Sequence, residues 1–184
     1  LMEISKYILE NTKHWISNCD SKISYLLTIN GVIITIIFSS ENAKYLVETF
    51  NLGPASICSL NHIINFFEYV TLLAFIAFLL LSLYQGLKAL KGQVNPKDFD
   101  EDYNKDEKSR IFWGDISQNS FNDYHNSVES FSENDFKKDL RKQVYINSKI
   151  CSLKFKLYNK MLSQTAYGFF YENLLKLTKW LSII

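Results

Sequence analysis

The sequence is short of the residues from which metal and redox sites are built. Its three cysteines and three histidines are scattered and match no metal-ligand or redox spacing, so the cysteines are expected to be free thiols. These six residues are Cys19, Cys58, Cys151, His14, His62 and His125. The pattern predicts neither a metal site nor a cofactor.

Sequence motifs of common enzymes are also absent. The chain contains no G-x-S-x-G, no glycine-rich phosphate loop, no H-E-x-x-H and no C-x-x-C, and we expect it not to be an enzyme. A secretory signal is not expected either. A polar, helix-like stretch from Met2 to Asp20 precedes the first apolar run, and no small-residue cleavage pattern follows that run.

Charge is missing from two long apolar runs, Ile23 to Ser40 and Tyr69 to Leu87. As helices they would be about 27 and 28 Å long, close to the roughly 30 Å of a bilayer's hydrocarbon core. We therefore predict an all-α membrane protein with two transmembrane helices followed by a mainly helical cytosolic module. The expected divisions are an N-terminal amphipathic cytosolic helix (1–22), transmembrane helix 1 (23–40), an external loop (41–65), transmembrane helix 2 (66–90) and the cytosolic sensor or oligomerisation module (91–184).

Lysine and arginine are scarce between the two runs, where the loop from Glu41 to Asn65 holds only Lys44. Lysines are more frequent before the first run and after the second: Lys6, Lys13, Lys22, Lys88, Lys91, Lys97 and Lys105. Because basic residues are enriched in cytoplasmic flanks, we expect a multi-pass protein with both termini in the cytoplasm.

Small and hydroxyl residues form a stripe on one helical face of the first run. The stripe consists of Ser24, Thr28, Gly31, Thr35 and Ser39, and Asn30 stands beside it near mid-membrane. Such a face permits close helix contact. It suits ordinary packing against the second span or, alternatively, the lining of a water-filled path in an assembly of several copies. At the outer end of the second span, we expect Glu68 to extend toward the headgroups rather than to be a buried functional acid.

Opposite charges separate along the second half of the chain. Residues 95–135 carry eleven acidic and four basic side chains, a sum of −7, and residues 136–160 carry eight basic and one acidic, a sum of +7. Pairing of these two blocks within the module is the default interpretation. Pairing between subunits or with an anionic ligand is the alternative.

Helical spacing dominates the predicted cytosolic module. Gly92, Asn95 and Pro96 should end the second span's helix, and the island Arg110–Ile116 has strand or tight-turn character. We expect a helix over 119–131 and then a long amphipathic basic helix, capped by Ser132 or Asn134 and continuing to about Met161. The tail 165–184 is expected to be a core-packing or interfacial helix, because Glu172, Lys176 and Lys179 argue against a span.

Three short motifs occur in order around these features. They are Asp20-Ser21-Lys22-Ile23-Ser24 leading into Asn30-Gly31, the island Ile111-Phe112-Trp113-Gly114-Asp115-Ile116, and Asp139-Leu140, Gln143-Val144-Tyr145 and Ser148-Lys149-Ile150 with Lys154. From about residue 17 to 165 the chain resembles the Pycsar-type transmembrane effectors. It departs from them at Ile23, where alanine is usual, and in lacking a Pro-Arg pair after the second span, where only Pro96 and Lys97 stand nearby.

The resemblance implies a bacterial antiphage effector of the inner membrane. Such a protein responds to a cyclic nucleotide made by a cognate cyclase and impairs the membrane, so that the infected cell stops growing. The implied partners are the lipid bilayer, further copies of the chain and the cyclic nucleotide as activating ligand, with no direct nucleic-acid binding. No cyclic-nucleotide-binding β-barrel is recognisable, so a ligand would bind the helical module.

A cyclic nucleotide requires cationic or hydrogen-bonding groups for its phosphate and an aromatic face for its base. The candidate ligand-binding residues are Arg110, Trp113, Asp115, Arg141, Gln143, Lys149 and Lys154. Alternatively, the lysines pair with the acidic block or lie at the anionic inner leaflet, and Trp113 anchors the core. Two other functions remain open: a membrane-anchored interaction subunit or toxin held by a partner protein, and a small channel or transporter component.

Overall fold

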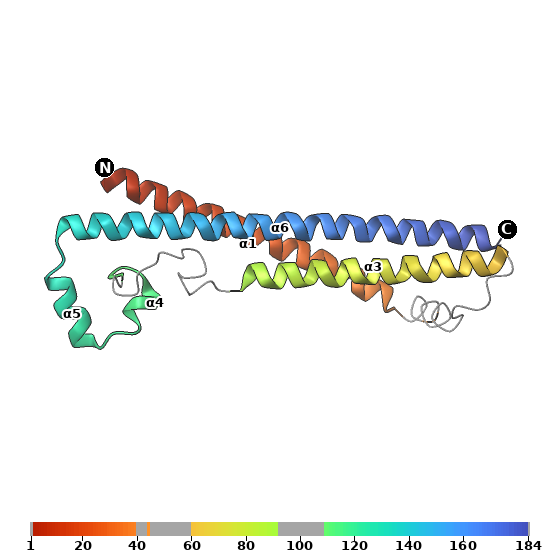
Figure 1. Ribbon diagram of the computed structural model, residues 1–184, viewed down its shortest axis with the longest axis horizontal. Helices are drawn as coiled ribbons and strands as arrows, with labels where there is room; N and C mark the ends of the chain where they lie inside the picture. The colour runs from red at the N-terminus through yellow and green to blue at the C-terminus, as the bar shows by residue number, and fades with distance from the viewer. Residues whose placement is uncertain (1, 40–43, 45–59, 92–108, 184) are drawn as a thin grey trace. The chain divides into compact units, whose positions relative to one another are not determined.

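The computed structural model describes residues 2–39, 44, 60–91 and 109–183. Its helices are α1 (Met2–Ile37), α3 (Leu60–Leu90), α4 (Trp113–Ile116), α5 (Phe121–Glu129) and α6 (Glu133–Ile183), as Figure 1 shows. The described residues contain no strand. This confirms the predicted all-α class.

Helix α1 is one uninterrupted helix of 36 residues. It joins the predicted amphipathic segment to residues 23–37 of the predicted first span, because no proline occurs in it and its only glycine, Gly31, lies near its end. Hydroxyl side chains can compete for the hydrogen bonds of the helical backbone, but here they donate to carbonyl oxygens of the same helix. The hydroxyls of Thr12 and Ser21 donate to the carbonyl oxygens of Ile8 and Ser17.

Two helices of the described residues are long and apolar enough to cross a membrane, Met2–Ile37 and the segment Phe66–Leu90 of α3. The first contains residues 23–37 of the first uncharged run, and the second contains the whole run from Tyr69 to Leu87. Most of the predicted external loop 41–65 and the predicted break at Gly92, Asn95 and Pro96 lie outside the described residues.

The island before α5 forms one helical turn, α4, so the strand alternative is wrong. Ser109 directs the chain into this turn, because its hydroxyl oxygen accepts from the backbone N–H of Phe112 at 3.0 Å. Gly114 is required by packing: a Cβ there would lie 2.5 Å from the Phe112 ring. The predicted helix over 119–131 is confirmed as α5, capped by Ser120, whose hydroxyl oxygen accepts from the N–H of Asp123.

Ser132, one of the two predicted caps, begins α6. Its hydroxyl oxygen accepts from the Asp135 N–H at 3.2 Å, and its own hydroxyl donates to Asp135 Oδ2 at 2.7 Å. These bonds hold the pKa of Asp135 below its usual value of 3.8. Since folding lowers this pKa, the capping contribution is complete above about pH 3.8 and is lost as pH falls through the lower folded value.

The predicted end of the long helix near Met161 is wrong, because α6 continues to Ile183 and has 51 residues. It contains no proline, and Gly168 is its only glycine, so nothing in the backbone stops it. At 1.5 Å per residue its length is about 77 Å.

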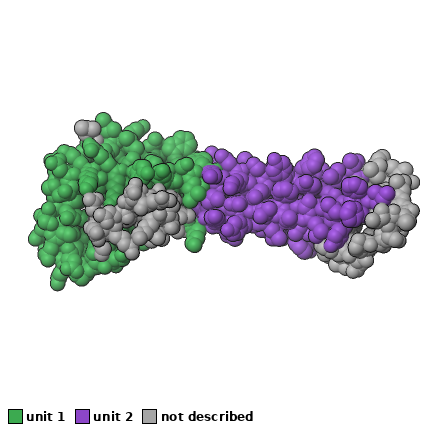
Figure 2. Space-filling model, in the orientation of Figure 1, with its two compact units in different colours: residues 1–21, 91–155 green, residues 22–90, 156–184 purple. Residues whose placement is uncertain are grey.

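The chain divides into two compact units, coloured in Figure 2. Unit 1 contains residues 1–21 and 91–155, and unit 2 contains residues 22–90 and 156–184. Helices α1 and α6 each contribute residues to both units. The structure thus places 156–184 in the same unit as the two apolar runs, whereas the predicted division assigns the whole of 91–184 to one cytosolic module.

Unit 2 is a bundle of three helices with an apolar core. Buried residues from all three helices fill it: Ile23 and Leu26 from α1, Leu72, Phe75, Leu79 and Ala89 from α3, and Leu157 and Met161 from α6. The three helices approach one another closely at Gly86, where a Cβ would lie 2.9 Å from both Leu27 and Met161. The tight packing requires glycine at this position.

Candidate functional site

A polar cluster in unit 1 attaches the segment before α4 to helix α6. The N–H of Ser109 donates to Asp115 Oδ2 and that of Arg110 donates to Asp139 Oδ2, both at 2.8 Å. Gln143 Nε2 donates to the Ser109 hydroxyl oxygen at 3.3 Å. Ser109, Asp139 and Gln143 are buried. This group, here called the Ser109 cluster, comprises Ser109, Arg110, Asp115, Asp139 and Gln143.

Within the cluster, the Arg110 guanidinium lies over an aromatic ring. Its Cζ is 4.7 Å from the centroid of Phe131, a distance suited to a cation–π contact. Its Nη1 atom is buried and has no hydrogen-bond partner in the part of the chain that the structure describes. Buried N–H groups are nearly always paired in proteins, so this atom indicates a place for an acceptor beyond the residues that the structure describes.

Trp113 stands three residues from Arg110 and is 63% exposed. Its ring contacts Phe112 at 5.6 Å between centroids, inclined by 50°, so its remaining surface is open to solvent. The alternative that Trp113 anchors the core is wrong. An open indole face is suited to stacking against a planar base.

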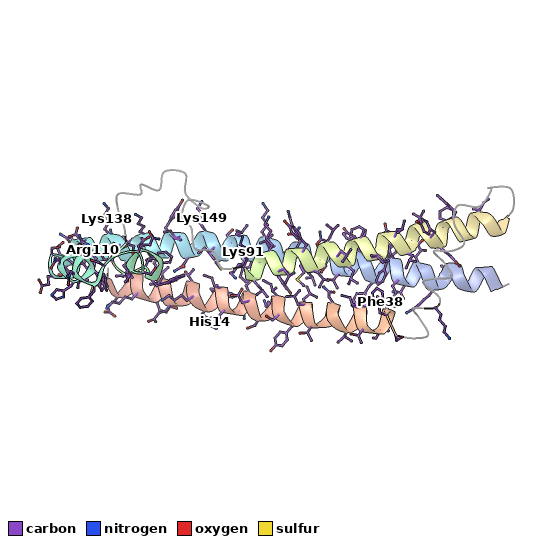
Figure 3. All side chains as sticks on the ribbon, turned by 90° about the horizontal axis from the view of Figure 1, so that it is seen from below. His14, Phe38, Lys91, Arg110, Lys138 and Lys149 are labelled. Carbon is purple, nitrogen blue, oxygen red and sulfur yellow. The ribbon has the colours of Figure 1, made fainter. Side chains whose placement is uncertain are left out.

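The other predicted ligand residues lie apart from the Ser109 cluster. Arg141 and Lys149 are exposed, and Lys149 Nζ lies 5.3 Å from the centroid of the Tyr145 ring. Figure 3 shows Lys149 on the side of α6 that faces away from α1. Arg141 is two positions from Gln143 and so points to a different side of the helix. The structure therefore brings together Arg110, Asp115 and Gln143, next to Trp113.

Lys154 forms an ion pair within unit 1. Its Nζ forms an ion pair with Asp20 Oδ1 at 2.5 Å, and its side chain is only 9% exposed. Along α6 it lies eleven residues from Gln143, a distance of about 16 Å. This pairing does not join the acidic and basic blocks, because Asp20 belongs to neither. An ion pair that does join them is Lys137–Glu133 at 2.6 Å, which lowers the pKa of Glu133.

A second polar group occupies the core of unit 2. Asn30 Nδ2 donates to Ser82 Oγ at 2.8 Å, and Thr165 Oγ1 donates to Asn30 Oδ1 at 3.3 Å. The hydroxyl oxygens of Ser82 and Thr165 are 2.7 Å apart. We call these three buried residues the Asn30 triad. It supplies the partner that an amide requires within an apolar environment.

The stripe of small residues on α1 does not pack against the second span, so that interpretation is wrong. Its residues are exposed, and a Cβ on Gly31 would have no atom within 4 Å. The hydroxyls of Thr28 and Thr35 each donate to a carbonyl oxygen of α1 itself at 3.0 Å. Glu68 also differs from expectation: it is buried in unit 2, at 5% exposure, instead of extending outward.

Four residues of these two groups, and the partner of Lys154, are not among the predicted site residues: Ser82, Ser109, Asp139, Thr165 and Asp20. Asp20 and Asp139 lie in the motifs that carry the family resemblance, but their pairing requires knowledge of distant contacts. Ser82 is a hydroxyl within an uncharged run, which was a usable signal. Ser109 and Thr165 had no signal in the sequence.

The fold and these groups define a small all-helical protein with two helices fit to cross a membrane and a separate polar cluster in its other unit. Residues 4–171 match the Pycsar effector protein domain. The chain is 38% identical over 157 residues to the Pycsar effector protein GmPycTM of Gulbenkiania mobilis, covering 83% of this chain and 79% of the relative. No solved structure matches this chain.

The chain therefore belongs to the Pycsar effector family. This confirms the resemblance seen in the three sequence motifs, and the matched region contains both the Ser109 cluster and the Asn30 triad. The protein is a transmembrane effector of antiviral defence.

Proposed function

We propose that this effector acts in the bacterial inner membrane, where a cyclic nucleotide from a cognate cyclase makes it oligomerise and disrupt the membrane. The observation that carries the proposal is the buried Nη1 atom of Arg110, which lacks a partner among the described residues. A cyclic phosphate carries the acceptor oxygens that such an atom requires.

The surroundings of Arg110 suit the rest of such a ligand. The exposed Trp113 offers a stacking surface for a base, and Phe112 supports its ring. Asp115 and Asp139 accept from the backbone N–H groups of Ser109 and Arg110, Gln143 donates to the Ser109 hydroxyl oxygen, and the role of these three side chains is to position the site. The exposed Arg141 and Lys149 lie outside this cluster and are suited to attracting an anion or the inner leaflet.

The stripe on α1 supports assembly. Its residues are exposed in the single chain, and Gly31 leaves room for the backbone of another helix. Because the hydroxyls of Thr28 and Thr35 are satisfied within α1, this face does not depend on water. We propose that it forms the contact between copies of the chain.

A second candidate function is an effector released by a partner protein. Phe121 is 79% exposed and Trp113 63% exposed, and aromatic residues of this kind are enriched where proteins bind one another. In this case the trigger would be a protein and not a nucleotide. The third alternative, a channel or transporter component, predicts no trigger of either kind.

A liposome experiment tests the nucleotide proposal. The full chain would be reconstituted in vesicles loaded with a self-quenched dye and exposed to a panel of cyclic mono- and oligonucleotides, with thermal shift measured in parallel. We expect one nucleotide to raise the melting temperature and to release dye. The variants Arg110→Gln and Trp113→Ala should lose both effects while keeping wild-type helicity.

The matched control is Trp15→Ala, which removes a half-exposed tryptophan of unit 1 whose ring contacts Phe155, twelve residues or about 18 Å along α6 from Gln143. It should respond as the wild type does. Full responses from Arg110→Gln and Trp113→Ala would place the nucleotide site elsewhere. A wild type that responds to no nucleotide would favour the partner-protein alternative.

A further inference from the structure

The C-terminal part of α6 follows helix α3 in a regular series of contacts. Ser82 meets Thr165, Phe78 stacks on Tyr171 with centroids 5.5 Å apart, and a Cβ on Gly168 would lie 3.9 Å from the Phe75 ring. Residue numbers fall along α3 as they rise along α6 from the contact of Gly86 with Met161, through the Ser82–Thr165 pair, to the position of Phe75 beside Gly168. The two helices therefore run antiparallel, as Figure 1 shows, and all of these contacts lie within unit 2.

These contacts fix the level of α6 relative to the uncharged runs. Phe75, Phe78 and Ser82 all lie inside the run from Tyr69 to Leu87, and Thr165 also bonds Asn30 inside the first run. From Tyr171, α6 continues for twelve residues to Ile183, about 18 Å. The same distance along α3 from Phe78 reaches Phe66, the outer end of the second span.

We infer that residues 156–183 form a third membrane-crossing segment and that α6 ends on the outer side of the membrane. If α3 and the second half of α1 cross the bilayer, a helix that follows them at the same depth must cross it too. An interfacial helix lies in the membrane plane and could not keep these contacts along α3. The inference replaces the expectation that both termini are cytoplasmic, and it does not rest on the nucleotide proposal.

The outward surface of this segment suits the acyl chains of the bilayer. Met161 to Tyr171 are eleven residues without a charge. The exposed large apolar side chains of this part of α6 are Leu162, Tyr167, Phe169, Phe170 and Leu177, with exposures between 40% and 62%. In water such a surface would be costly, whereas lipid covers it without penalty.

The charged residues of this segment argue against a span when they are only counted. Their arrangement, however, reduces the free-energy cost of placing them in the membrane. Glu172 and Lys176 are one helical turn apart and form an ion pair at 2.8 Å. Lys179 lies four residues before the end of α6, near the outer end of the inferred segment. Pairing and proximity to an end are the two conditions under which charges occur within spans.

The distribution of basic residues gives an independent argument. Five lysines stand in the nineteen residues 142–160, which precede the segment and include its first turn: Lys142, Lys149, Lys154, Lys156 and Lys160. Only Lys176 and Lys179 follow. Because cytoplasmic flanks carry the excess of lysine and arginine, this asymmetry places the beginning of the segment inside and its end outside.

Reporter fusions test the inference in whole cells. Alkaline phosphatase, which is active only outside the inner membrane, and a fluorescent protein that folds only in the cytoplasm would each be fused after Ile184 and after Lys160. We expect active phosphatase and no fluorescence after Ile184, and the reverse after Lys160. An insertion near Gly53 gives the external reference.

Fluorescence with inactive phosphatase at both fusion points would overturn the inference, and so would active phosphatase at both. A smaller probe guards against disturbance by the reporters. A short epitope tag after Ile184 should be removed by protease added to intact spheroplasts. A tag that remains protected until the spheroplasts are lysed would also overturn the inference.

Discussion

At the level of single residues, the ion pair between Lys154 and Asp20 joins α6 to α1 within unit 1. The lysine side chain is 9% exposed and the aspartate side chain 37% exposed, so one charge is buried and the other is partly hydrated. Such a pair contributes mainly by preventing an unpaired buried charge. Lys154 is therefore better explained as a structural residue than as a contact to a phosphate.

Removal of the Lys154 charge should weaken unit 1 without abolishing a nucleotide response. We expect Lys154→Ala to lower the stability of the protein by about 1–3 kcal/mol, toward the lower end because water screens Asp20. Thermal unfolding in detergent measures the loss. Lys149→Ala, which removes an exposed lysine of the same helix, is the control and should unfold as the wild type does. If Lys154→Ala had wild-type stability but bound no nucleotide, Lys154 would have to be a ligand-binding residue after all.

At the level of helices, the exposed stripe on α1 is the feature that most directly concerns assembly. We expect Gly31→Leu to reduce crosslinking between copies, because bulk at Gly31 prevents the close approach of a second helix. A loss of about 1.4 kcal/mol in association would reduce the assembly constant about tenfold. Ile29→Phe adds bulk at an exposed position on another side of α1 and should crosslink normally. Equal crosslinking of Gly31→Leu and wild type would mean that lipid covers the stripe.

Helix boundaries were predictable where they depend on nearby residues. Ser132 begins α6 and Ser120 begins α5 because a hydroxyl three residues before a free N–H caps it, which is visible in the sequence. The end of α6 was not predictable in this way. Glu172 and Lys176 suggest a change of environment when counted as separate charges, and only the folded helix shows that they neutralise each other.

The residues of the candidate sites were likewise predictable only where they lie close together in the sequence. Arg110 and Trp113 lie three residues apart, so a short motif indicates both. The Asn30 triad joins residues 52 and 135 positions apart, and the partner of Lys154 lies 134 positions away. Periodicity shows that Asn30 faces the interior of a bundle or a path, but it does not say which hydroxyls meet it.

At the level of the whole molecule, a signal-gated effector and a passive anchor differ in what they do to a cell. We expect expression of the full chain together with the cyclase that makes its proposed cyclic nucleotide to stop growth and to admit a membrane-impermeant dye. The chain alone or the cyclase alone should do neither. Gly31→Leu should reduce both effects if assembly precedes damage. Dye entry is measured by flow cytometry. Normal growth and dye exclusion with the signal present would favour an anchor or a housekeeping transporter.

The Asn30 triad also limits how unit 2 can move. If α6 slid along its axis by one turn, about 5.4 Å, Met161 or Phe169 would replace Thr165 beside Asn30 and Ser82. Neither side chain can replace the lost hydrogen bonds, and the abandoned amide and hydroxyl would remain in an apolar interior. The three helices therefore have a single axial register, in which all hydrogen bonds of the triad are made. Whatever signal reaches this bundle must act by tilting or turning it as one body, not by a piston stroke of one helix past another.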